Sequence, residues 1–363
     1  MKNFLSKNFL SSGLGIILSG GIIGIIAVTL QKLGNPANMG ICAACFERDI
    51  AGALGLHRVE IIQYIRPEIA GLALGAFIIA IFKNEYQPRG GSSTIVRFFL
   101  GMFAMIGALV FLGCSWRALL RIAGGDWNGI TGLLGLIVGV AVGVIFFKNG
   151  YTLGKSNKLK KSSGWVFPAF MVILLIMLAL KFKVSETGPV FFSTTGPGSQ
   201  HAPVLISLGA GLLIGILAQR SRFCTIGSIR DIILVRDFHL AKGVLAFLIA
   251  AAVFNLIYGQ FKPGFYDQPI AHPVHVMNFL GMVLAGLAFT LAGACPGRQL
   301  ILAGEGDSDA AIFVMGMIFG AGISHNFLIA SSGAGPGAFG LGGVIIGLVF
   351  CLIVGFTMRD RIA

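Results

Sequence analysis

Charged residues are scarce in this chain of 363 residues. Only 11% are Asp, Glu, Lys or Arg, against roughly 25% in an ordinary soluble domain, and 56% are hydrophobic. So few charges exclude an ordinary soluble globule, and so much hydrophobicity excludes a disordered chain. A nucleic-acid-binding protein, which gathers Lys and Arg on an exposed face, is excluded as well. The composition therefore predicts a polytopic membrane protein.

Catalytic and nucleotide-binding motifs are also missing. The sequence has no P-loop, dinucleotide-binding glycine fingerprint, G-x-S-x-G or H-E-x-x-H, so nothing indicates nucleotide hydrolysis or ordinary hydrolase chemistry. Glycine is abundant, at 53 residues. Because glycine permits close helix packing and interrupted helices in a membrane, a channel or transporter is favoured over a simple anchor. We expect no enzyme activity and no cofactor, and transport that is secondary, facilitated or driven by a cytoplasmic partner.

Ten stretches are apolar for about 20 residues, the length that crosses a bilayer. The first follows a short basic start and is too long for a signal peptide, so we expect it to be retained. Ten crossings put both termini on one side, together with 18 of the 27 Lys and Arg residues. The positive-inside rule makes that side cytoplasmic and residues 185–201 an external loop. The stretches are 13–33, 66–82, 95–113, 129–147, 165–181, 203–220, 241–259, 275–293, 310–329 and 338–357.

Two cysteine motifs recur along the chain at nearly the same spacing. Residues 42–50 (CAACFERDI) align with 224–232 (CTIGSIRDI) at an offset of 182. Residues 114–126 align with 295–307 at an offset of 181. Five expected spans separate the two copies, and an odd number places them upside down relative to each other. The sequence thus predicts an inverted repeat, in which a substrate site usually lies at the repeat interface.

The residues after each motif cysteine are too short or too polar to cross the membrane. We expect them to be re-entrant half-helices, because such segments at membrane depth must line a cavity or be buried in protein. The expected fold class is an all-α polytopic membrane protein of about ten transmembrane helices with re-entrant half-helices in an inverted repeat. The half-helices are 43–56, 115–123, 225–234 and 296–304. The expected parts are a first repeat (1–150), a basic linker with an extra span and an external loop (151–202), a second repeat (203–335) and a C-terminal span (336–363).

Each repeated cysteine stands directly before a predicted half-helix. A helix N-terminus attracts anions, and a thiol is a weak, soft hydrogen-bonding group. Thiols in this setting suit a sulfur- or selenium-bearing anion better than a hard oxyanion such as phosphate. The alternative is that they are small buried residues, which is how we interpret the unrepeated Cys351. The predicted substrate-binding thiols are Cys42, Cys45, Cys114, Cys224 and Cys295.

Charged residues accompany the cysteines. Arg117 and Arg298 follow Cys114 and Cys295 by one helical turn, and we expect them to attract an anion at two vestibules. Two further Arg-Asp pairs either hold the half-helices as structural ion pairs or lie in wet loops. These pairs are Arg48 with Asp49 and Arg230 with Asp231. Asp126 and Asp307 are expected to be helix N-caps or salt-bridge partners.

Cys42 and Cys45 form a C-x-x-C, which elsewhere indicates a thioredoxin-like redox pair or half of a zinc site. The strand-helix context of thioredoxin is absent, and zinc would need two more ligands, with only His57 nearby. We therefore expect no metal. The alternative function is a membrane-embedded thiol oxidoreductase or sulfur transferase that uses this pair covalently, and a third is a non-transporting scaffold or sensor. His272 and His275 are expected to be an incidental surface pair.

These motifs resemble the YeeE/YedE family of membrane proteins, whose members include thiosulfate importers. The resemblance implies an hourglass-shaped protein of the bacterial inner membrane whose neck thiols relay thiosulfate by hydrogen bonding. The resemblance implies that the neck cysteines are among Cys42, Cys114 and Cys295, with Cys224 at the fourth repeat position. It also implies a partner, a small cytoplasmic sulfur carrier of the SirA or TusA type. Residues 41–57, with a second thiol, are similar to the branch described as selenium transporters, so both substrates stay open. The matching motifs are 40–49, 112–117, 222–231 and 292–298.

Overall fold

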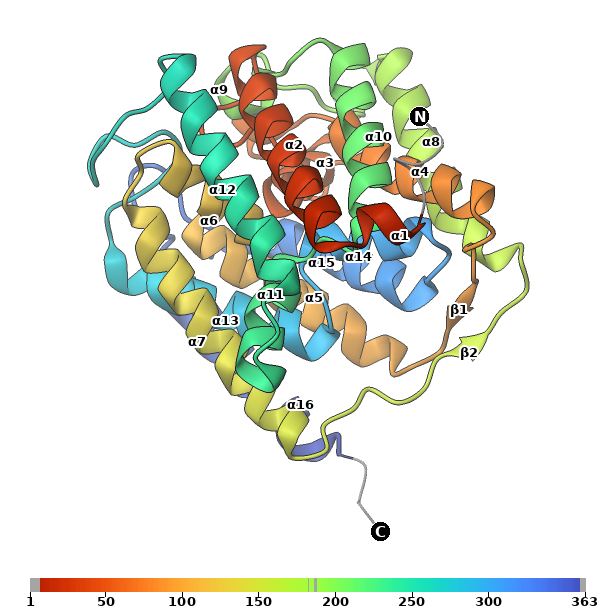
Figure 1. The fold of residues 1–363 in the computed structure, drawn as a ribbon. Helices are drawn as coiled ribbons and strands as arrows, with labels where there is room; N and C mark the ends of the chain where they lie inside the picture. Colours follow the sequence, from red (N-terminus) through yellow and green to blue (C-terminus); the bar gives the residue numbers. More distant parts are fainter. Residues whose placement is uncertain (1–6, 182, 186–187, 360–363) are drawn as a thin grey trace.

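The computed structural model describes residues 7–181, 183–185 and 188–359, and this part of the chain is mainly helical (Figure 1). Two small antiparallel sheets complete it: β1 (Arg89–Gly90) with β2 (Asn157–Lys158), and β3 (Lys183–Ser185) with β4 (Gly188–Pro189). The helices are α1 (Lys7–Leu10), α2 (Gly13–Lys32), α3 (Ala43–Ala53), η1 (Glu60–Ile62), α4 (Pro67–Phe82), α5 (Thr94–Phe111), α6 (Ser115–Ala123), α7 (Asn128–Lys148), η2 (Ser163–Trp165), α8 (Val166–Ala179), α9 (Gly196–Ser199), α10 (Val204–Ser221), α11 (Thr225–Val235), α12 (His239–Ile257), α13 (His275–Ala292), α14 (Pro296–Gly304), α15 (Ser308–Asn326) and α16 (Gly340–Thr357).

Nine helical segments in the described residues are long and apolar enough to cross a membrane. They correspond to nine of the ten predicted spans, and the all-α polytopic fold class is confirmed. The tenth expected span, 165–181, corresponds to a shorter apolar helix, Ser163–Ala179, formed by η2 and α8. It lies at the lower end of the length range that crosses a bilayer. Lys181, which follows the helix, has a left-handed conformation with φ at 42°.

Four short helices, α3, α6, α11 and α14, begin directly after the motif cysteines, as the sequence predicts. In three of them the chain turns sharply before the cysteine. Leu112, Arg222 and Gly293 each stand two residues before it and have φ values of 64°, 59° and 96°. Each left-handed residue ends the preceding long helix and redirects the chain into the short one. The α3 helix stops at Ala53, three residues before its predicted end.

The long helices pack in pairs. For each pair there is a second pair in which both helices are replaced by their counterparts from the other copy of the repeat. Helix α2 packs on α12 (Figure 1), and its mate α10 packs on α4. Likewise α5 packs on α15, and its mate α13 packs on α7. Helices α5 and α13 pack on each other and join the copies. A pseudo-two-fold axis produces this arrangement, which is the symmetry of the predicted repeat.

Glycines at equivalent positions bring these helices into backbone contact. A Cβ built on Gly135 of α7 would collide with the carbonyl oxygen of Phe279 on α13. A Cβ built on Gly316 of α15 would collide with the carbonyl oxygen of Phe98 on α5. Gly316 stands 181 positions after Gly135, and Phe98 stands 181 positions before Phe279. The abundance of glycine therefore serves close helix packing, as is common in membranes.

Candidate functional site

The four repeated cysteines are N-cap residues of the four short helices. In three of them the thiol sulfur accepts the backbone N–H three residues later. The Sγ–N distances are 3.3 Å for Cys42, 3.2 Å for Cys224 and 3.4 Å for Cys295. These thiols thus act as Ser or Thr usually does at an N-cap. The N-terminal end of each helix, with its partial positive charge, lies at a thiol.

The cysteines form two pairs, one within each copy of the repeat. Cys42 donates a hydrogen bond to Cys114, with 3.6 Å between the sulfur atoms. In the second copy the backbone N–H of Cys295 lies 3.5 Å from the Cys224 sulfur. All four are free thiols. Three are 0% exposed, and Cys224 is 6% exposed.

A hydroxyl contact joins the two pairs. Ser115, directly after Cys114, and Thr225, directly after Cys224, have their side-chain oxygens 2.6 Å apart. The two thiol pairs and this contact form one buried cluster, which we call the cysteine neck: Cys42, Cys114, Ser115, Cys224, Thr225 and Cys295. Sequence reasoning missed both hydroxyls, although their positions directly after motif cysteines were a usable signal.

The two arginines that follow the neck have different surroundings. Arg117 is 0% exposed and lies 3.6 Å from the Cys45 sulfur. It also donates to the carbonyl oxygens of Leu112 and Ile270, and among the described residues no carboxylate forms a salt bridge with it. Arg298 instead lies 3.1 Å from Glu305. A net positive charge therefore remains on the first-copy side of the neck, next to Cys45.

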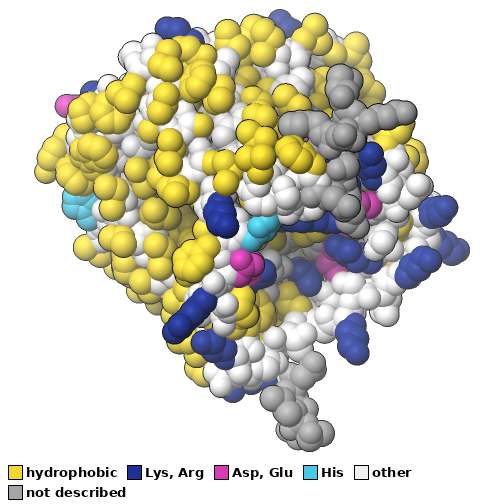
Figure 2. Space-filling view, in the orientation of Figure 1, with side chains coloured by type: hydrophobic (Ala, Val, Ile, Leu, Met, Phe, Trp, Pro, Cys, Tyr) yellow, Lys and Arg dark blue, Asp and Glu magenta, His cyan; other side chains and the backbone are white. Residues whose placement is uncertain are grey.

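The two Arg-Asp pairs of the repeat also differ in exposure. Arg48 lies 2.6 Å from Asp49, and these side chains are 2% and 0% exposed. Arg230 lies 2.8 Å from Asp231, where the corresponding values are 30% and 23%. The ion pair of the first copy is therefore enclosed by protein, and that of the second is only partly covered. On the face shown in Figure 2, charged side chains gather in the lower half beside a largely hydrophobic surface.

A third charged residue, which the sequence did not indicate, also pairs with Asp49 in the first copy. Arg66, at the N-cap of α4, is 0% exposed and lies 2.7 Å from Asp49. It also donates to the carbonyl oxygens of Pro197 and Gln200, both at 2.8 Å. These carbonyls belong to the segment expected as an external loop, of which residues 186–187 lie outside the described part. This loop is therefore tied down over the first-copy ion pair.

The other residues singled out from the sequence cap a helix, form ion pairs or contact the backbone. Asp307 accepts the N–H of Ala310 at 3.0 Å and pairs with Arg89, while Asp126 lies 2.6 Å from Arg121. His272 is 0% exposed, and its Nε2 lies 2.9 Å from the Val110 carbonyl oxygen. Our expectation of a surface pair with His275 is therefore wrong for His272. The loop folds inward there, and burial lowers the pKa of this histidine.

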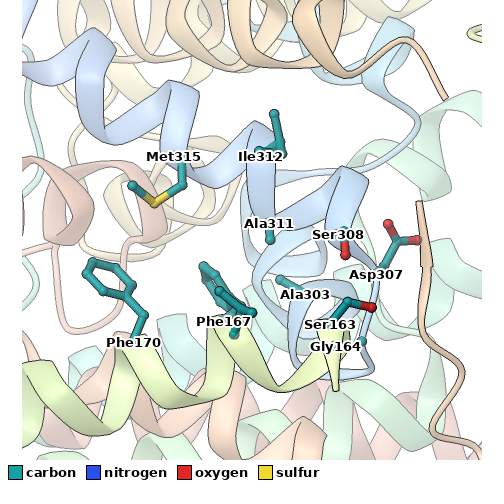
Figure 3. Close-up of a pocket in the computed structure, with 12 residues that line it drawn as sticks. Ser163, Gly164, Phe167, Phe170, Ala303, Asp307, Ser308, Ala311, Ile312 and Met315 are labelled. Carbon is teal, nitrogen blue, oxygen red and sulfur yellow. The ribbon is translucent and has the colours of Figure 1, made fainter. Parts of the chain in front are cut away.

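Two pockets lie on the sides of the helix bundle. One, of about 470 Å³, is bounded by α8 on one side and by α14 and α15 on the other. Phe167, Phe170 and Met315 make its wall apolar (Figure 3), and no neck residue lines it. The second, of about 230 Å³, opens between α7 and α12 and reaches Ser115 and Thr225. Their apolar walls suit hydrocarbon chains better than a hydrated anion.

Cys45 and Cys351 complete the set of thiols. Cys45 lies in the first turn of α3 beside Arg117 and is 0% exposed. Cys351 lies in α16, apart from the neck, and is also 0% exposed. Among the described residues, no group of three or more His, Cys, Asp or Glu side chains is arranged to hold a metal ion.

The fold and the cysteine neck define an all-α polytopic membrane protein with a buried thiol cluster between two symmetric halves. Residues 220–354 match the family described as "Sulphur transport". The chain is also similar to the thiosulfate transporter TsuA of Escherichia coli (strain K12), with 30% identity over 104 residues. This match covers 28% of the chain and 29% of the relative, so the chain spans less than a third of that protein's length. Both matches confirm the resemblance to the YeeE/YedE family.

Proposed function

We propose that the protein imports a small sulfur-containing anion across the bacterial inner membrane through the cysteine neck. Thiosulfate, or a selenium species of similar size and charge, is the proposed substrate. The observation that carries the proposal is the pairing of four N-cap thiols, joined through Ser115 and Thr225. The sulphur-transport match over residues 220–354 supports the same substrate class. We therefore favour a transporter over an enzyme.

The neck handles the anion by hydrogen bonding alone in this account. Cys42 donates a hydrogen bond to the Cys114 sulfur, so the S–H of Cys114 is left to donate to an anion. The backbone N–H groups at the helix N-termini add partial positive charge of roughly half an elementary charge per helix. The neck residues themselves carry no full charge, so the anion is stabilised there without being held too tightly, while Arg117 attracts it from beside Cys45. Thiols, which are soft and polarisable, favour the terminal sulfur of thiosulfate over the oxygens of sulfate.

The difference between the two copies supports a direction of transport. The first-copy ion pair is enclosed by protein and covered by a loop, whereas the second-copy pair is partly exposed. The positive-inside rule places the basic residues around the second copy in the cytoplasm, together with both termini. We therefore propose that this structure is closed toward the outside and more open toward the cytoplasm.

A cytoplasmic carrier protein is the proposed acceptor of the imported sulfur. Exposed lysines precede α8 and give this face a positive charge that an acidic carrier surface would meet. A small carrier of the SirA or TusA type fits this role. The exposed lysines are Lys155, Lys158, Lys160 and Lys161.

The thiol-enzyme alternative rests on Cys42 and Cys45. Both are 0% exposed, so a protein thiol cannot reach them for exchange without a large opening, and this favours the hydrogen-bonding account. Uptake of labelled thiosulfate into proteoliposomes, with selenite and sulfate as competitors, tests the proposal. We expect saturable uptake that selenite or sulfate inhibits to different extents. Cys45→Ser should keep transport, and complete loss in both Cys42→Ser and Cys45→Ser would favour the enzyme.

A further inference from the structure

Glu47 is a carboxyl group buried next to the cysteine neck. It lies in α3, whose eleven residues are all buried, and is itself 0% exposed. Neither of its carboxyl oxygens has a hydrogen-bond partner among the described residues. By contrast, Glu68, another fully buried carboxyl group, accepts a hydrogen bond from Asn35 at 2.7 Å. Glu47 therefore has no evident structural partner that explains its presence.

The neighbouring charges are engaged elsewhere. Arg48 and Arg66 both bind Asp49, at 2.6 and 2.7 Å, while Glu47 lies five residues after Cys42, the neck thiol that caps the same short helix. The elements packed on α3 are α4, α5, α14, α15 and η1. Their titratable or charged groups are Glu68 and the capping Arg66 for α4, Arg97 for α5, Arg298 for α14, Asp309 and His325 for α15, and Glu60 for η1.

The internal repeat shows that the fold does not need a carboxyl group at this position. The residue equivalent to Glu47, at the offset of 182, is Ile229 in α11. The two helices begin with the same capping thiol and share the Arg-Asp pair one position later. An apolar residue thus satisfies the same position in the second copy, and the acid is an addition specific to the first.

Physical chemistry fixes the state of this side chain. An ionised carboxylate without hydrogen bonds or a counter-ion is very costly to bury, so such a group takes up a proton instead. Ionisable residues inside membrane proteins commonly line ion pathways and proton relays. Two arginines against one aspartate leave one positive charge nearby, which can stabilise the ionised form when water enters.

We propose that Glu47 is a proton-binding site and that one proton travels inward with each anion. This inference rests on the proposed function, since it assigns the coupling ion of the same neck. With the neck loaded, the protonated carboxyl donates its O–H to the anion or to the Cys114 sulfur. When the neck opens to the cytoplasm, the O–H bond breaks, the proton passes to water and Glu47 becomes a carboxylate. The carboxylate takes up a new proton from water on the outer side.

A pH gradient across proteoliposomes tests the coupling. For one proton per anion, an outside one pH unit more acidic raises the equilibrium accumulation of thiosulfate about tenfold. We expect this gain in the wild type and in Glu60→Gln, which alters an exposed acid. In Glu47→Gln we expect uptake that no longer responds to the gradient. An undiminished response in Glu47→Gln overturns the proposal. Glu47→Asp, which keeps the titratable group, should retain part of the response.

An infrared measurement separates this inference from the proposed function. The carbonyl stretch of a protonated carboxylic acid is expected in difference spectra when thiosulfate binds the purified protein, and it should vanish in Glu47→Gln. Persistence of that band in Glu47→Gln, or its absence in the wild type, contradicts the proton site whether or not the protein transports. If the band behaves as expected but no anion crosses the membrane, the transport function fails and the proton site stands.

Discussion

The hydroxyl oxygens of Ser115 and Thr225 lie 2.6 Å apart and join the thiol pairs of the two repeat copies. Each hydroxyl belongs to the first residue of a short helix, so the contact sets how the helix starts of α6 and α11 face each other. The equivalent residues of the other pair of helices are Ala43 and Pro296, which have no hydroxyl to form such a contact. Of the two symmetry-related positions, the one with Ser115 and Thr225 therefore carries the hydroxyl contact between the copies.

Removal of one hydroxyl of this contact should weaken the neck. Ser115→Ala leaves the buried oxygen of Thr225 without its partner, and we expect a loss of about 1–3 kcal/mol in unfolding free energy. Ser115→Ala combined with Thr225→Val removes both polar groups and should cost less than the sum of the single changes. Thermal unfolding in detergent of the wild type, Ser115→Ala, Thr225→Val and the double variant measures this coupling. Strict additivity would show that the two hydroxyls do not interact.

The two Asp residues of the repeat should differ sharply in their contribution to stability. Asp49→Asn leaves Arg48 and Arg66 buried without a carboxylate, and we expect a loss of about 3–5 kcal/mol. Asp231→Asn, at the equivalent position, breaks a partly exposed pair and should cost less than about 1 kcal/mol. Thermal unfolding of the two variants side by side checks the difference. Equal losses would contradict the enclosure of the first-copy ion pair by protein.

Close glycine contacts between the repeat-related helices should tolerate no side chain. Gly135→Ala and Gly316→Ala each place a Cβ against a carbonyl oxygen of the facing helix, so we expect both to lose about 1–3 kcal/mol. Gly342→Ala in α16 is the matched control, because a Cβ there meets open space. Unfolding temperatures compare the three. A loss in Gly342→Ala as large as in the others would refute the packing explanation.

Acidification should destabilise the protein through His57, in the loop between α3 and α4. Burial lowers the pKa of His57 to about 4, from about 6.5 in the unfolded chain. The unfolded state therefore binds the proton more tightly, so the contribution of this residue is complete above pH 6.5 and is lost as the pH falls toward 4. Between pH 7.5 and 5.5 we expect a loss of about 1 kcal/mol. His57→Gln should lack that component of the pH dependence, and an unchanged dependence would count against the buried neutral imidazole.

Local sequence signals located most elements of this fold. Apolar runs gave nine spans, and the repeated cysteines gave the starts of all four short helices, since Cys295 followed by Pro296 is a typical helix N-terminus. The signal was insufficient where the outcome depends on tertiary contacts. The pairing of Arg66 with Asp49 joins α4 to α3 across 17 residues, and no periodicity encodes it.

The same limit applies to α8 and His272. An apolar run predicts the existence of a helix better than its length, and the helix formed by η2 and α8 ends at Ala179, two residues before the predicted end. Burial of His272 follows from its contact with Val110, 162 residues away. The candidate site was predictable as a set of thiols, whereas their pairing and the link through Ser115 and Thr225 required the folded structure.

Uptake of labelled thiosulfate by Cys114 variants in proteoliposomes tests the central claim most directly. Loss of one hydrogen bond at the neck corresponds to about 0.5–1.5 kcal/mol, or roughly a two- to tenfold slower rate. We expect Cys114→Ser, whose hydroxyl still donates, to retain a measurable part of the rate, and Cys114→Ala to fall further. Cys351→Ala, outside the neck, should match the wild type. Uptake by Cys114→Ala at the wild-type rate would contradict a neck in which thiols hand the anion across the membrane.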